Sequence, residues 1–108
     1  MVGRPGARVS GQESLPSGAR RWRVEGRVQG VGFRRFVWQA ARDRRLAGWV
    51  ANAADGSVVV AAAGPEADLD DLARRLAAGP GSSRVERLIE EWRGSEPGWA
   101  GFEIRNGE

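Results

Sequence analysis

The sequence lacks cysteine, histidine and tyrosine, and all 17 of its basic residues are arginine, so lysine is missing as well. Without cysteine there is no disulfide, no thiolate nucleophile and no zinc–thiolate site. Without histidine the chain has neither the commonest general base nor the commonest transition-metal ligand. Any chemistry must therefore rest on arginine, carboxylates, hydroxyls, amides and backbone groups.

Two further absences concern membranes and export. No apolar run approaches the roughly 20 residues that a membrane-spanning helix needs. The N-terminus also lacks the apolar core of a secretory signal. We therefore expect a cytoplasmic protein that has no membrane partner.

The composition is that of an ordinary globular domain. The 108 residues are 41% hydrophobic and 29% charged, which allows one domain with a packed core. The formal net charge is +3, but 14 acidic residues are interspersed among the arginines. The basic balance alone therefore does not indicate a nucleic-acid partner.

Hydrophobic patterning predicts where the domain begins and which elements it contains. Residues 1–19 are rich in Gly, Pro, Ser and Arg without apolar periodicity, which predicts a disordered extension before a domain over residues 20–106. The first expected elements are a strand from Arg21 and a helix from Phe33 or Arg34 to Leu46, which Gly48 closes. Strands over 49–52 and 57–63 follow, joined through a hairpin at Asp55-Gly56, and then a helix that begins at Gly64-Pro65-Glu66 and ends at Gly79-Pro80. The chain is expected to end with a strand over 83–92 that has an irregularity near Arg87-Leu88, a loop over 94–101 and a strand over 102–105.

This order of elements is typical of one known architecture. A β-α-β-β-α-β chain with a short terminal strand forms a mostly antiparallel sheet with both helices on one face. The predicted fold is therefore an α+β, ferredoxin-like α/β sandwich.

The stretch Gly30-Val31-Gly32-Phe33-Arg34 leads from the first strand into the first helix. Two glycines spaced by one residue allow successive N–H groups to converge on one point, and a helix N-terminus adds its positive dipole end. Arg34 contributes a planar fork of donors that matches a phosphate or carboxylate. The stretch therefore predicts an anion-binding turn, although the glycines could instead form only a tight turn before a solvated Arg34.

Better-known phosphate motifs do not fit this stretch. A P-loop requires a lysine, and a dinucleotide fingerprint requires a third glycine in register, so we expect neither nucleoside triphosphates nor NAD. An RNA-recognition domain shares the element order, but it stacks bases on aromatic side chains of its third strand. Here the third strand, over 57–63, contains no aromatic residue.

Two segments together resemble the acylphosphatase family. Residues 28–34 match its V-Q-G-V-x-F-R motif and residues 48–52 match G-W-V-x-N. The resemblance extends over nearly all of residues 21–105. It implies hydrolysis of acyl phosphates to a carboxylate and inorganic phosphate, without a metal, a cofactor or a covalent intermediate.

The resemblance also implies a role for individual residues. The family's phosphate-binding arginine falls on Arg34, and its water-positioning asparagine falls on Asn52. Gln29 and Phe33 match motif positions that shape the loop. The implied phosphate-binding loop consists of Gln29, Gly30, Val31, Gly32, Phe33 and Arg34. From its position alone, Asn52 could instead be a strand-end residue that caps the hairpin.

Some positions depart from the pattern expected of relatives. Arg35 stands where an aromatic or apolar residue is common, Ala53 where a hydroxyl residue often follows the asparagine, and Asn106 where a tyrosine is expected. These departures put substrate preference in doubt, and a second cation beside Arg34 would strengthen phosphate attraction if it faces the loop.

Two other functions remain open from the sequence. Acylphosphatase-like modules also occur in larger maturation enzymes that handle carbamoyl phosphate, although the length of a single domain argues against that role. A binding module of the same fold would hold a phosphate of RNA or of a metabolite without cleaving it. We expect a monomer that binds a small-molecule acyl phosphate, releases inorganic phosphate and has no nucleic-acid partner.

Overall fold

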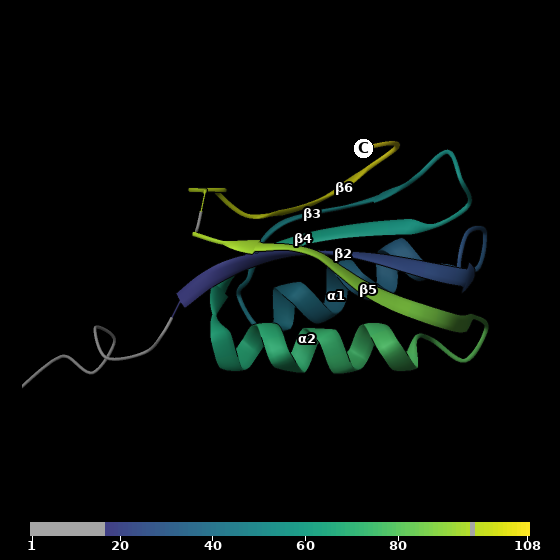
Figure 1. The fold of residues 1–108 in the computed structure, drawn as a ribbon, viewed down its shortest axis with the longest axis horizontal. Coiled ribbons are helices and arrows are strands. Elements are labelled where there is room, and N and C mark those ends of the chain that lie inside the picture. Colours follow the sequence, from purple (N-terminus) through teal and green to yellow (C-terminus); the bar gives the residue numbers. More distant parts are fainter. Residues whose placement is uncertain (1–16, 96) are drawn as a thin grey trace, which may run out of the picture.

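One five-stranded sheet with two helices on a single face makes up the computed structural model, which describes residues 17–95 and 97–108. Figure 1 shows both helices below the sheet. The elements are β2 (Ser17–Arg27), α1 (Phe33–Asp43), β3 (Ala47–Asn52), β4 (Val58–Pro65), α2 (Glu66–Ala78), β5 (Arg84–Gly94) and β6 (Phe102–Arg105). This arrangement confirms the predicted ferredoxin-like α+β fold.

The strand order β5-β2-β4-β3-β6 places the ends of three strands at one edge of the sheet. Both β2 and β3 pair antiparallel with β4, and Val24 and Asn52 both lie opposite Val58. The last strand, β6, pairs parallel with β3, with Arg105 opposite Ala51. Because β2, β3 and β6 therefore run in the same direction, their C-terminal ends meet where α1 begins.

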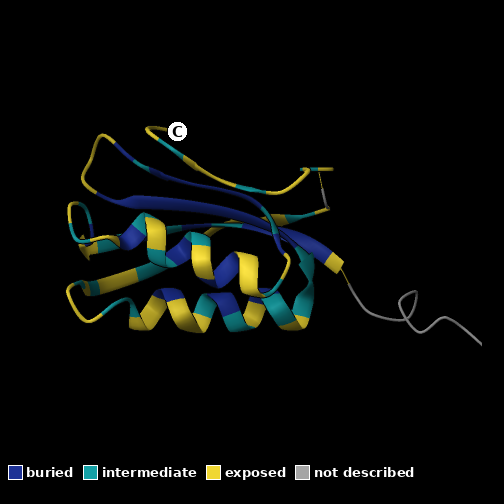
Figure 2. Cartoon of the chain, turned by 180° about the vertical axis from the view of Figure 1, so that it is seen from behind, coloured by how far each residue is buried: buried dark blue, intermediate teal, exposed yellow. Residues whose placement is uncertain are grey.

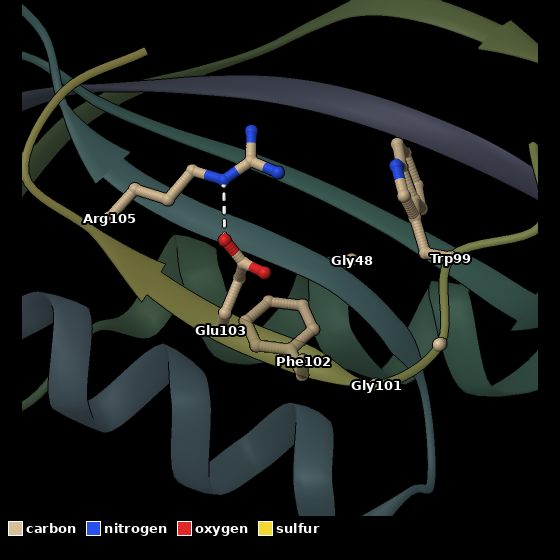
Figure 3. Close-up of a pocket in the computed structure, with 7 residues that line it drawn as sticks. Gly48, Trp99, Gly101, Phe102, Glu103 and Arg105 are labelled. Atoms are coloured by element: carbon tan, nitrogen blue, oxygen red, sulfur yellow. Dashed lines mark hydrogen bonds and ion pairs between the residues drawn. The ribbon is translucent and has the colours of Figure 1, made fainter.

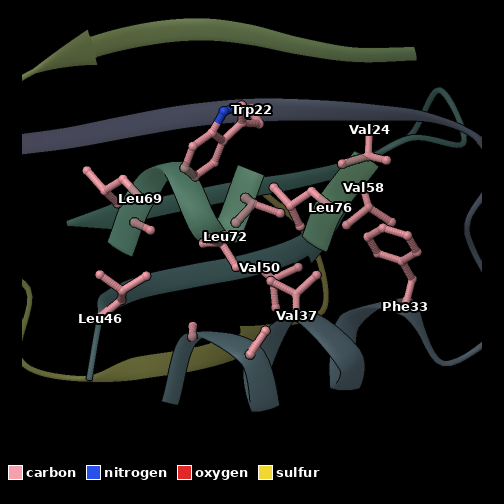
Figure 4. Packing of buried hydrophobic residues seen from close by; sticks show 14 of the residues in the cluster. Trp22, Val24, Phe33, Val37, Leu46, Val50, Val58, Leu69, Leu72 and Leu76 are labelled. Atoms are coloured by element: carbon pink, nitrogen blue, oxygen red, sulfur yellow. The ribbon is translucent and has the colours of Figure 1, made fainter. Parts of the chain in front are cut away.

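The main core lies between the sheet and the helices (Figure 4). Each helix buries one stripe of apolar side chains, as its sequence periodicity predicts, and leaves the opposite stripe exposed (Figure 2). The fully buried large side chains of this core include Trp22, Val24, Phe33, Val37, Val50, Val58, Leu69, Leu72 and Leu76. None of the helices in the described segments is both long enough and apolar enough to cross a membrane.

The first strand begins earlier than the sequence predicts. Ser17, Gly18 and Ala19 pair with residues 63–65 of β4, and the side chain of Ala19 is fully buried. The prediction that these three residues belong to a disordered extension is therefore wrong, because small residues without apolar periodicity still pair with β4 inside the sheet. The remainder of that extension, residues 1–16, lies outside the described residues.

Gly48 does not close the first helix. The helix ends at Asp43, and Arg45 takes the left-handed conformation, with a φ of 55°, that a glycine usually supplies after a helix. Gly48 is buried within β3 at a φ of 143°, where a Cβ would lie 1.9 Å from the carbonyl oxygen of Ala61. It is a glycine because β4 passes too close for any side chain.

The irregularity of β5 lies at other residues than the sequence predicts. Its pairing with β2 shifts register twice, at Glu86 and at Glu91, whereas the sequence predicts one irregularity near Arg87-Leu88. The strand continues to Gly94, so the following loop is shorter than predicted.

A buried arginine joins β2 to the start of α2. Arg20 is 4% exposed and donates hydrogen bonds to the carboxylates of Glu66 and Asp70, the latter at 2.8 Å. The hydrogen bond from Arg20 lowers the pKa of Asp70 below its ordinary value of 3.8. The pKa of Glu90 is also lowered, first by its hydrogen bond from Arg93 and further by the charge of Arg20.

These pKa directions predict how stability depends on pH. A carboxyl whose pKa is lower in the folded state stabilises the fold above its unfolded pKa, and that stabilisation is lost as the pH falls through the folded pKa. We expect the free energy of unfolding in urea to fall below about pH 4.5. Arg20→Met is expected to lower it by about 2 kcal/mol at pH 7 and to weaken its acid dependence.

Arg74→Met is the matched control, because Arg74 pairs with Asp71 on the exposed side of α2. Such a surface pair contributes little, so the control is expected to retain the wild-type pH dependence. Equal stability of Arg20→Met and Arg74→Met at every pH would show that the buried cluster has no such role.

Candidate active site

The loop between β2 and α1 leaves the N-terminus of the helix uncapped by any side chain. Gly30 and Gly32 have φ values of 75° and 80°, and Gly32 occupies the N-cap position. No side chain accepts a hydrogen bond there, and the first turn of α1 has no acidic residue. A Cβ added at either glycine would meet no atom within 4 Å. The loop therefore needs glycine for its backbone conformation, which directs helix N–H groups toward open space.

Gln29 ties this loop to the β3–β4 hairpin. Its Nε2 donates to the carbonyl oxygens of Ala53 and Ser57, each at 2.8 Å. Ala53 directly follows β3, whose last residue is Asn52, and Ser57 directly precedes β4. The side chain of Gln29 therefore fixes the distance between the glycine loop and the strand end that carries Asn52.

Arg34 lies in the first turn of α1 and reaches toward the end of β6. Its Nη1 donates to the carbonyl oxygen of Arg105 at 2.9 Å. The side chain is half-buried and forms no ion pair with any carboxylate in the described parts of the chain. The remaining donors of its guanidinium are therefore available to an anion.

Asn52 and Arg34 line the same pocket, whose volume is about 210 Å³. The hairpin after Asn52 is held by other groups, because the carboxylate of Asp55 accepts from the backbone N–H and the hydroxyl of Ser57. The side chain of Asn52 has no hydrogen-bond partner among residues 17–95 and 97–108, so a capping role is not observed. The pocket is lined by Val28, Gly30, Gly32, Phe33, Arg34, Arg35, Asn52 and Ile104.

Two of the predicted loop residues do not line this pocket. Gln29 acts through the hairpin, and the carbonyl oxygen of Val31 accepts a hydrogen bond from the hydroxyl of Ser82 at 2.8 Å. Phe33 lines the pocket while being 99% buried (1% exposed), and its ring lies 5.7 Å from that of Phe36. None of these contacts uses a backbone N–H group of residues 30–34.

Two features of the site were not predicted from the sequence, and a third, the side of the helix on which Arg35 lies, was left open. Ile104 lines the pocket from β6, the carbonyl oxygen of Arg105 orients Arg34, and Arg35 lines the pocket beside Arg34. The first two depend on the parallel pairing of β6 with β3, a contact between segments about 50 residues apart. The only sequence signal for Arg35 is its position directly after the motif arginine.

A hollow lined by Arg42 and Arg45 lies at the C-terminal end of α1, where no helix N–H groups are free to bind an anion. Figure 3 shows another hollow, of about 250 Å³, at the start of β6, where the only cation, Arg105, pairs with Glu103 at 2.8 Å. The guanidinium of Arg105 also lies 4.9 Å above the ring of Trp49. No cluster of three or more carboxylates that is suited to a metal ion occurs within the described residues. The turn at the start of α1 is therefore the best candidate for an anion site.

Comparison with known proteins identifies a family for this chain. The family model for acylphosphatase matches residues 20–104. The chain belongs to the acylphosphatase family. An acylphosphatase of Koribacter versatilis is 51% identical over 85 residues, which cover 79% of this chain and 77% of that protein. The family and the relatives make this chain an acylphosphatase, which hydrolyses acyl phosphates.

Solved structures give the same result for the fold. The acylphosphatase of Bacillus subtilis is 40% identical with a TM-score of 0.78, and the match covers 82% of this chain and 98% of that one. An acylphosphatase from Coxiella burnetii is 29% identical with a TM-score of 0.80, covering 90% and 100%. Full-length HypF, in a phosphate- and nucleotide-bound form, matches with 26% identity over 86% of this chain but only 12% of its own.

The two hydrogen bonds of Gln29 predict a measurable coupling between the loop and the hairpin. Gln29→Leu removes both bonds and is expected to lower the free energy of unfolding by about 1–3 kcal/mol. The hydrolysis of acetyl phosphate should also slow, because the glycine loop and Asn52 lose their fixed separation. Gln39→Leu makes the same chemical change on the exposed face of α1 and should alter neither quantity. Identical behaviour of the two variants would contradict the coupling.

Proposed function

We propose that this acylphosphatase binds the phosphoryl group of its substrate with Arg34 and the backbone N–H groups of residues 30–34, and that Asn52 holds the attacking water. The observation that carries the proposal is the pocket in which these groups meet without any carboxylate. The uncapped start of α1 and the free donors of Arg34 both favour an anion there.

The reaction needs few groups because the substrate is already activated. The water oxygen forms a bond to phosphorus while the bond from phosphorus to the acyl oxygen breaks, and the electron pair leaves with the carboxylate. Catalysis then requires mainly that the charge on the phosphoryl oxygens be stabilised and that the water be aligned with the leaving oxygen. Arg34 and the loop serve the first purpose, and the amide of Asn52 serves the second.

The proton of the water passes to a phosphoryl oxygen of the substrate in this proposal. No side chain that lines the pocket is a general base, since its polar side chains are two arginines and one asparagine. The leaving carboxylate is a weak base and needs no proton at neutral pH. The products are therefore a carboxylate and a protonated inorganic phosphate.

A nucleic-acid partner has less support. The open face of the sheet carries Trp49, with Arg21 and Arg105 above its ring at 5.6 and 4.9 Å. Arg21 pairs with Glu91 and Glu108, however, and Arg105 pairs with Glu103. These carboxylates would repel a phosphate backbone. We therefore propose that the substrate is a small molecule and that no nucleic acid binds. We also propose a monomer, since one chain supplies every group of the site, and a cytoplasmic location.

Replacement of Arg34 tests the binding half of this proposal. Arg34→Ala is expected to lower kcat/KM for acetyl phosphate at least about a hundredfold, because two charge-assisted hydrogen bonds of about 1.5–3 kcal/mol each are lost. Arg34→Lys should recover little of it, because a point charge does not replace the planar fork. Arg42→Ala, on the same helix but outside the pocket, is the control. Near-normal turnover in either Arg34 variant would disprove the assignment.

Replacement of Asn52 tests the water-positioning half. Asn52→Ala should lower kcat for acetyl phosphate about 10- to 100-fold, whereas the inhibition constant for inorganic phosphate should change by less than about twofold. Asn106→Ala replaces the other asparagine of the chain, which is exposed after β6, and should behave as wild type. An Asn52 variant that loses phosphate binding while keeping kcat would assign Asn52 to the phosphoryl group instead.

A further inference from the structure

Arg35 lines the active-site pocket but lies apart from the groups that hold the phosphoryl group. It follows Arg34 on α1, its side chain is exposed, and its guanidinium lies 5.6 Å above the ring of Trp38. No ion pair or hydrogen bond involves its guanidinium anywhere in the described residues. Its charge is therefore uncompensated at the rim of the pocket.

Helix geometry separates Arg35 from Arg34. Successive side chains on an α-helix point about 100° apart, so neighbours in sequence do not face the same target. Arg34 is directed to the carbonyl oxygen of Arg105 on β6, whereas Arg35 is directed along the helix surface to Trp38. A phosphoryl group held by Arg34 would therefore leave Arg35 beside the part of the substrate that projects outward.

The β6 side of the pocket offers a contact of a different kind. Ile104 is 41% exposed, and it lines the pocket together with Val28. An acyl group that extends from the phosphoryl group toward β6 would meet this apolar surface, with Arg35 on the neighbouring side of the pocket. No lining residue is a carboxylate, so nothing in the pocket repels an anionic acyl group.

We propose that Arg35 is a specificity-determining residue that selects acyl phosphates whose acyl group carries a second anionic group, such as a carboxylate. The carbon skeleton of the acyl group would contact Ile104, and its anionic end would pair with the guanidinium of Arg35. This inference rests on the proposed function, because it requires the phosphoryl group to be bound at Arg34.

The test compares matched aromatic acyl phosphates. Benzoyl phosphates with a carboxylate in the meta or para position are compared with their uncharged carboxamide counterparts, which have nearly the same size. We expect the wild-type enzyme to have a kcat/KM about two- to fivefold higher for at least one carboxylate compound, mainly through a lower KM, as for an exposed ion pair. The preference should shrink as the salt concentration rises.

Variants of α1 assign that preference to a residue. Arg35→Gln should bring the carboxylate-to-carboxamide ratio of kcat/KM to about one, and Arg35→Lys should restore part of it, because a single charge suffices for this contact. Arg42→Gln is the matched control, because it removes the same charge from α1 and its guanidinium also lies near Trp38, 4.8 Å from the ring. Arg42 lines no part of the pocket, so this variant should keep the wild-type ratio.

Three results would overturn the inference. A wild-type ratio of one for both ring positions would show that no second anion is recognised. An equal loss on carboxylate and carboxamide compounds in Arg35→Gln would place Arg35 at the phosphoryl group. An equal loss of the ratio in the Arg35 and Arg42 variants would indicate a general field of the helix. Failure of the proposed function would look different, since an Arg34→Ala enzyme would then still hydrolyse unsubstituted benzoyl phosphate.

Discussion

The antiparallel pairing of β4 with both β2 and β3 is the constraint on which the rest of the structure depends. It forces β2 and β3 to run in the same direction, so that the glycine loop after β2 and Asn52 at the end of β3 arrive at one edge of the sheet. The parallel addition of β6 then brings the carbonyl oxygen of Arg105 to the same edge, where it orients Arg34. Gln29 completes this arrangement with two hydrogen bonds from the loop to the hairpin. Each functional group thus follows a strand end whose position the pairing of the sheet determines.

The sequence predicted those parts of the fold that local patterns encode. Such local signals are the alternation of apolar residues in β2, the Asp55-Gly56 hairpin, and the proline and acidic residues at the start of α2. The corresponding elements are all observed. Gly48 misled the prediction because a glycine after a helix usually ends it, whereas here it accommodates the close approach of β4. Ser17 was missed because a small, weakly hydrophobic segment joins the sheet only through its partner strand. The residues that β6 contributes to the site could not be predicted from the sequence for the same reason, since the register between β3 and β6 is a tertiary property.

Arginine is used in two distinct ways in this protein. On the open face of the sheet and beneath α2, arginines such as Arg20, Arg21 and Arg23 pair with carboxylates, so their charges are compensated locally. On α1, Arg34 and Arg35 have no such partners within the described residues, and both line the pocket. The modest net charge of +3 conceals this division. Other arginines without an ion pair in the described residues, such as Arg42 and Arg45, lie outside this pocket. The pocket is distinguished by two such arginines beside the uncapped start of α1.

The absence of carboxylates from the pocket has a chemical cost and a chemical reason. A carboxylate beside Asn52 would serve as a general base for water, but it would repel the phosphoryl group whose oxygens the loop must hold. A substrate with a poor leaving group would in addition need a general acid that protonates the leaving oxygen. An acyl phosphate releases a carboxylate that is stable without a proton, so binding and alignment contribute more than proton transfer. In the proposed mechanism, a pocket formed by two arginines, one asparagine and backbone N–H groups suffices for an acyl phosphate. It is poorly suited to phosphate esters, whose alkoxide leaving groups require protonation.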